Sequence, residues 1–183
     1  MLAVAGLLQA DDAKERIEQL LNEGQQLEET KNWADALAKY QEARKTAQAS
    51  KLSAEQAEAA LASGRMVERA SPTDAGSNEA AKLYQEAAQV GTPEQQQVAL
   101  NNLGTLDLKS RKDKDAVEKF GRIKFDLLAA QDAYTIHYNY AAALDRNGET
   151  EKAREQYQQS MNNVASLCGG DSASQGKIGR AHV

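Results

Sequence analysis

The sequence predicts an all-α fold built from about four helix-turn-helix repeats. Alanine supplies 33 of the 183 residues, and Gln, Glu, Leu and Lys are also frequent, whereas there are only two prolines and 5% aromatic residues. Alanine and long unbranched side chains favour helices, while strands prefer the β-branched and aromatic residues that are sparse here. A pattern that recurs four times along the chain indicates the repeats.

Each copy of the pattern has a small residue in a first helical segment, an alanine in the next segment, and an aromatic residue four positions after that alanine. The small residue and the alanine are 12 positions apart in three copies and 16 apart in the second. Residues four apart lie above one another on a helix face, so the alanine and the ring should face the same neighbour. The four sets are Gly24, Ala36 and Tyr40; Gly64, Ala80 and Tyr84; Gly104, Ala116 and Phe120; and Ala141, Ala153 and Tyr157.

Apolar periodicity and helix-breaking residues predict eight helices. Pro93 suits the first turn of its helix because its missing N–H needs no partner there, and Thr92 before it can accept hydrogen bonds from free amides. The turn-forming stretch 71–77 accounts for the four extra residues of the second repeat. The helices span about 12–29, 33–48, 53–69, 77–90, 93–109, 113–128, 131–146 and 150–166.

The recurring pattern resembles the tetratricopeptide repeat (TPR). The resemblance implies a right-handed α-solenoid, in which each helix pair buries its apolar stripe by stacking on the next pair. It covers most of the chain, in an array that we place at 11–167. The predicted repeats are about 13–50, 53–92, 93–128 and 131–167.

The resemblance also implies a non-catalytic scaffold for protein–protein interaction, which binds a peptide or partner segment in a concave groove. Asparagine amides suit such a groove because they both donate and accept hydrogen bonds, and arginine can hold a carboxylate in a fork. The groove would be mildly basic, so an acidic or C-terminal peptide is expected. By analogy, the first helices place eight residues in it: Arg65, Arg69, Asn101, Asn102, Lys109, Tyr138, Asn139 and Arg146, with Asn22 and Gln25 beside them in the first repeat.

Two alternatives stay open. Asn102 and Asn139 stand where such repeats often carry asparagine whatever they bind, so they could serve the scaffold instead of a ligand. The array could also be the repeat segment of a larger enzyme or sensor protein whose other domain lies outside this sequence.

The sequence offers no catalytic or metal-binding constellation and implies no cofactor. His137 is the only histidine before the last six residues, and the single cysteine, Cys168, cannot build a thiolate metal site. We expect His137 to pack inside its helix pair. A net charge of −5 gives no support for nucleic-acid binding, which depends on neutralising phosphates. No apolar run reaches the ~20 residues that span a bilayer.

Both ends of the chain are unusual. Residues 1–10 are apolar and small, which indicates either a truncated signal-peptide remnant or a frayed start of the first helix. Bacterial export and a cytoplasmic location therefore both stay open. Residues 168–183 are expected to be a disordered tail. Its last six residues, 178–183, resemble a translated sequencing adapter, so we expect the natural chain to continue past about Gly176.

Overall fold

The computed structural model of the protein describes residues 2–169, and the side chains of residues 11–164 within them. Every regular element in residues 2–169 is helical, which confirms the predicted all-α class. The predicted tail over 168–183 starts too early, because α8 continues to Gly169; the rest of that tail, including 178–183, lies outside the described residues. The elements are α1 (Leu2–Glu29), α2 (Trp33–Ala49), α3 (Ser53–Ala70), α4 (Asp74–Val90), α5 (Pro93–Lys109), α6 (Asp113–Gly121), the one-turn 3-10 helix η1 (Phe125–Leu127), α7 (Ala130–Arg146) and α8 (Thr150–Gly169).

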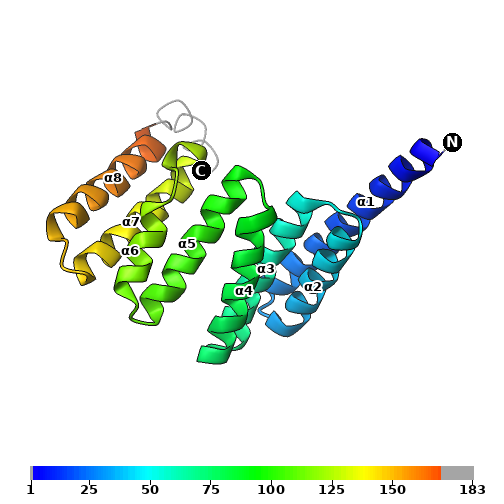
Figure 1. The fold of residues 1–183 in the computed structure, drawn as a ribbon, viewed down its shortest axis with the longest axis horizontal. Coiled ribbons are helices and arrows are strands. Elements are labelled where there is room, and N and C mark those ends of the chain that lie inside the picture. The colour runs from blue at the N-terminus through cyan, green and yellow to red at the C-terminus, as the bar shows by residue number, and fades with distance from the viewer. Residues whose placement is uncertain (1, 170–183) are drawn as a thin grey trace, which may run out of the picture. The chain divides into compact units, whose positions relative to one another are not determined.

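The chain divides into two compact units, Met1–Leu103 (unit 1) and Gly104–Val183 (unit 2). In unit 1, α2 packs against α1 and α3, and α3 packs against α4; in unit 2, α7 packs against α6 and α8. Successive helices in each unit run in alternating directions, as helix-turn-helix repeats require (Figure 1). No helix within residues 2–169 is both long enough and apolar enough to cross a membrane.

The repeated glycine and aromatic ring meet in each of the first three helix pairs. A methyl group built onto Gly24, Gly64 or Gly104 would lie less than 3.0 Å from the ring of Tyr40, Tyr84 or Phe120, respectively. These rings are almost completely buried, with 3%, 0% and 0% of their surface exposed. The missing Cβ therefore lets a ring on the second helix lie directly against the backbone of the first.

The fourth helix pair has Ala141 at the glycine position. Its methyl group stands where the other repeats leave room for a ring. Tyr157, the matching aromatic residue, is only half-buried and packs edge-on against Tyr138, with ring centroids 5.6 Å apart and planes at 64°. Ser160, one turn after Tyr157, is buried and its Oγ donates a hydrogen bond of 3.0 Å to the backbone oxygen of Tyr134.

The start of α5 confirms the cap predicted from Thr92 and Pro93. The helix begins at Pro93, and the Oγ1 of Thr92 accepts from the backbone N–H of Gln95 at 3.3 Å. The Gln95 side chain returns the interaction, because its Oε1 accepts from the N–H of Thr92 at 2.9 Å. This reciprocal pair is a capping box, which satisfies two otherwise free amides.

Helix α4 begins earlier than predicted. We expected a loop over 71–77, but α4 starts at Asp74. The Oγ1 of Thr73 accepts from the N–H of Gly76 at 3.2 Å and caps the first turn. Because the turn formers Asp74 and Gly76 are compatible with a first helical turn, their presence did not mark a loop.

Helix α6 is shorter than predicted, so the expected helix over 113–128 is wrong beyond Gly121. The chain turns there because it places two apolar side chains inside unit 2. Ile123 is buried, and the ring of Phe125 in η1 stacks on His137, with centroids 3.7 Å apart and planes at 7°. If α6 continued as a helix to residue 128, Phe125 would lie farther along that helix and would not reach His137.

Helix α1 also begins earlier than predicted, at Leu2 instead of about residue 12. Residues 2–10 thus share one helix with the residues that pack in unit 1. Whether they are a signal-peptide remnant stays a prediction, because a signal segment and a first helical turn are both apolar and helical.

Four helices end in the same tight cap. Lys31, Lys51 and Arg111 adopt positive φ angles of 60°, 58° and 61°, and Gly148 one of 82°. After α2, the N–H of Lys51 bonds the carbonyl of Gln48 at 3.2 Å, and the N–H of Leu52 bonds that of Ala47 at 2.9 Å. This hydrogen-bond pattern is the Schellman motif, whose left-handed position favours glycine.

Replacing Lys51 with glycine should therefore stabilise the protein by about 0.5–1 kcal/mol, because a side chain with positive φ costs about 1–2 kcal/mol and added unfolded-state freedom offsets part of the gain. Urea unfolding would measure the change. The matched control is Lys45→Gly in the exposed interior of α2, which should destabilise by about 1 kcal/mol. The same sign for both substitutions would contradict the cap geometry.

Candidate functional site

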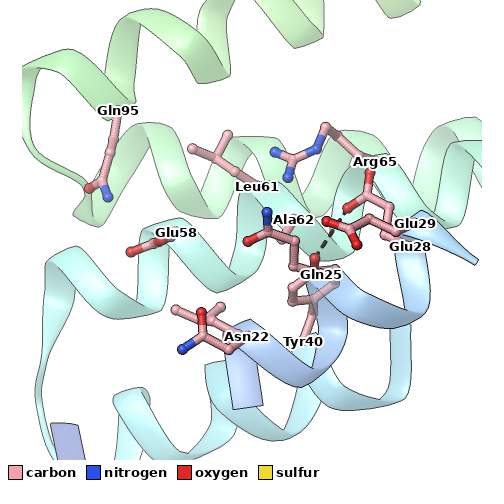
Figure 2. A pocket seen from close by; sticks show the side chains of 11 residues that line it. Asn22, Gln25, Glu28, Glu29, Tyr40, Glu58, Leu61, Ala62, Arg65 and Gln95 are labelled. Atoms are coloured by element: carbon pink, nitrogen blue, oxygen red, sulfur yellow. Dashed lines mark hydrogen bonds between the residues drawn. The ribbon is translucent and has the colours of Figure 1, made fainter. Parts of the chain in front are cut away.

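A hollow in unit 1 lies between the first helices of two successive repeats. It has a volume of about 710 Å³, and α1 and α3 form its walls. Figure 2 shows side chains from both helices pointing into it, with Tyr40 of α2 below and Gln95 of α5 at one side. The lining residues are Leu21, Asn22, Gln25, Glu28, Glu29, Tyr40, Glu58, Leu61, Ala62, Arg65 and Gln95.

A second hollow of about 430 Å³ adjoins the first. It shares Leu21, Asn22 and Glu58 with it, and adds Lys14, Ile17, Glu18 and Glu55. Both hollows lie between α1 and α3 and have three lining residues in common, so they are described together. We call the pair the α1–α3 trough, defined by the lining residues of the two hollows.

Apolar side chains form the floor of the trough. Tyr40 and Ala62 belong to a buried cluster with Ala36 and Met66, and Leu21 packs against this cluster. Since the cluster holds α1, α2 and α3 together, the floor is part of the core of unit 1. Its shape is therefore fixed before any ligand binds.

One carboxylate of the trough is tied into the fold. The Oη of Tyr40 donates a 3.1 Å hydrogen bond to Oε2 of Glu28, and the Nη2 of Arg69 lies 3.8 Å from Oε1 of the same residue. Burial, and then the charge of Glu28, raise the pKa of Tyr40 to about 12. The phenol stays protonated at neutral pH and holds the carboxylate in place. The Arg69 guanidinium also lies 4.9 Å above the Trp33 ring.

Of the four predicted groove residues in unit 1, one lines the trough and three do not. Arg65 is exposed in the trough, together with Asn22 and Gln25 of the first repeat. Arg69 lies beside it on Glu28 and Trp33. Asn101 and Asn102 are half-buried neighbours on α5, joined by a 3.2 Å hydrogen bond between their amides. They are not among the residues that line the trough.

The other predicted groove residues lie in unit 2. Tyr138 is 54% exposed and packs on Tyr157. Arg146 pairs with Asp113 at 2.7 Å. Lys109 is exposed at the end of α5, and Asn139 is half-buried on α7. The convergence of all eight residues on one groove stays a prediction, because four lie in each unit.

The sequence prediction missed the acidic side chains of the trough. Glu18 and Glu58 lie three residues before Leu21 and Leu61, and Glu29 lies four residues after Gln25, on the same helix faces. That spacing was a usable signal once Asn22 and Gln25 had been placed in the groove. Acidic residues are common on solvated helix faces, so their number alone did not distinguish these three.

His137 packs inside its helix pair, as expected. It is 8% exposed, and its Nδ1 lies 2.7 Å from Oε1 of Gln156. Burial lowers its pKa, and the hydrogen bond to Gln156 opposes the shift. Its imidazole, stacked on Phe125, thus belongs to the packing of unit 2. Among the residues described, no group of three or more His, Cys, Asp or Glu could hold a metal ion.

Comparison with known proteins finds similar folds. No protein-family model and no curated protein matches the chain. BtubC (BKLC) from P. vanneervenii has a TM-score of 0.70 at 15% identity over 84% of this chain and 65% of BtubC, so the match spans just under two thirds of that protein. Two MamA crystal structures give TM-scores of 0.61 and 0.59 at 15% and 16% identity, covering 84% and 88% of this chain and 81% and 79% of MamA. At such identities the likeness concerns the fold alone, and the fold is a TPR-like α-helical repeat.

Proposed function

We propose that the protein is a non-catalytic scaffold of the TPR type, which binds an extended peptide or partner segment. The α1–α3 trough carries this proposal. It is an open depression with a preformed apolar floor and polar walls, between the first helices of successive repeats. Extended segments suit such a surface because the floor can accept a side chain while the walls satisfy the peptide backbone.

Particular residues of the trough fit this role. Asn22 and Gln25 are exposed on α1, and their amides can donate to and accept from a peptide backbone. Half-buried Leu21 lines the trough from one wall, and Leu61, which is 6% exposed, lines it from the other. Because helices position all of these side chains, little ordering would be needed on binding.

An acidic partner stays a prediction for the eight-residue groove. Two of its four cations face carboxylates: Arg69 lies by Glu28 and Arg146 pairs with Asp113. These cations therefore offer a ligand less charge than the sequence suggested. Bacterial export and membership of a larger protein are likewise predictions that no feature of the trough supports.

Filling the trough tests the function. A random dodecapeptide library displayed on phage would be selected against the full chain, and binding of enriched peptides measured by fluorescence anisotropy. Gln25→Trp should abolish binding, because the indole would occupy the trough. Gln26→Trp, on the neighbouring exposed position outside it, should leave binding within about twofold, as surface changes outside a binding site have little effect. Peptides that bind both variants equally would place the binding surface elsewhere, and a library without enrichment would contradict the function.

A further inference from the structure

The α1–α3 trough has an unbalanced charge. Five carboxylates line it, against the two cations Lys14 and Arg65: Glu18, Glu28, Glu29, Glu55 and Glu58. The imbalance is opposite to the mildly basic groove that the sequence predicts.

Two of these carboxylates are already compensated. Glu55 lies 3.9 Å from the Nζ of Lys14, and Glu28 contacts Tyr40 and Arg69. The other three, Glu18, Glu29 and Glu58, are exposed and form no ion pair with the described residues. Their charge is therefore available to a ligand that enters the trough.

The two ion pairs also fix how the walls lie. Lys14 with Glu55 and Glu28 with Arg69 show that α1 and α3 run side by side in the same direction. Glu18 and Glu58 therefore lie at nearly the same level of the trough, one on each wall, on the side of Lys14 and Glu55. Each wall places a leucine three residues later, at Leu21 and Leu61, on the face that lines the trough.

We infer that the α1–α3 trough binds a basic segment of a partner protein, in which a lysine or arginine lies next to a large apolar residue. The inference rests on the proposed function and names the class of its partner. The cationic head would lie near Glu18 and Glu58, and the apolar side chain would lie on Leu21 and Leu61. The apolar stem of a lysine or arginine side chain can lie along the leucines while its charged head reaches the carboxylates.

Arg65 makes the two ends of the trough different in charge. It lines the hollow four residues after Leu61, one helical turn farther from Glu58. Its positive charge disfavours a second basic side chain at that end. At the other end the charge of Lys14 is compensated by Glu55. The segment should therefore carry its basic residue near Glu18 and Glu58, because like charges in contact lower affinity.

The dodecapeptide library tests this inference through the charge of the peptides it yields. Selection against the wild-type full chain should enrich peptides with lysine or arginine beside a large apolar residue. For one such synthetic peptide, Glu18→Gln with Glu58→Gln should weaken binding about tenfold, since two solvent-exposed ion pairs with the peptide would be lost. Raising the salt concentration should weaken wild-type binding as well.

The matched control is Glu15→Gln with Glu79→Gln, which removes the same charge from two exposed positions outside the trough. It should leave binding within about twofold, because screened charges that are not in contact have little effect. Equal weakening by both double variants would overturn the site. Enriched peptides that are acidic or uncharged would overturn the basic partner but leave the scaffold function, whereas a library without enrichment would overturn both. Circular dichroism would check that each variant is folded.

Discussion

Replacing Tyr84 with alanine should lower the free energy of unfolding by about 3–5 kcal/mol, the range measured for buried aromatic rings. The ring is 0% exposed and lies directly against the backbone at Gly64. Its Oη donates a 2.6 Å hydrogen bond to Oε1 of Glu68, and burial raises its pKa, so the phenol remains the donor. Removal leaves a cavity between α3 and α4 that their backbones can close only in part.

Trp33, the only tryptophan of the chain, lies in unit 1 and can report this change during urea unfolding. Tyr84→Phe is the control, because it keeps the ring and loses only the hydrogen bond, at a cost of about 1 kcal/mol. A Tyr84→Ala midpoint equal to that of the wild type would mean that the ring does not hold the helix pair together.

Replacing Gly104 with leucine should destabilise unit 2 by about 3 kcal/mol, at the upper end for overpacked cores. Even the first carbon of the new side chain would lie less than 3.0 Å from the fully buried ring of Phe120. Phe120 cannot move away easily, because Tyr140 packs against it with ring centroids 6.0 Å apart.

A second substitution, at Phe120, should partly offset the loss of stability. In a Phe120→Ala background the leucine at position 104 would fill part of the space that the ring leaves. The double variant should therefore be more stable than the sum of the two losses, by about 1–3 kcal/mol. Hydrogen exchange of amides in α6 and α7 would follow unit 2 separately from unit 1. Strictly additive losses would show that the glycine and the ring are not in contact.

The sequence predicted the repeat because its signal is local. The pair Gly24 and Tyr40 recurs at the same offset as Gly104 and Phe120, and the same physical need for close approach recurs in these helix pairs. Most helix boundaries followed from caps and breakers, as at Thr92 and Pro93. The end of α6 did not, because Ile123 and Phe125 leave the helix to reach partners in unit 2, and such tertiary packing overrides local helix preference.

The candidate site was less predictable than the fold. Arg65, Asn22 and Gln25 were placed in the groove by analogy, and they do line the trough. The character of the trough depends on Glu18 and Glu58, which look like ordinary solvated residues in the sequence. Their position on facing walls is visible only where α1 and α3 lie side by side, because the charge of a surface is a property of both walls together.

The contact between a glycine and a ring recurs within single helix hairpins, α1 with α2 and α3 with α4, and Gly104 with Phe120 follows the same rule. Both partners of each contact are therefore encoded in one short stretch of chain. A hairpin duplicated in tandem would therefore contain both the glycine and the ring that packs against it. No matching substitution would be needed elsewhere in the chain. Such a protein can lengthen or shorten by whole hairpins, and a chimera that exchanges one hairpin for another should keep its internal spacing intact.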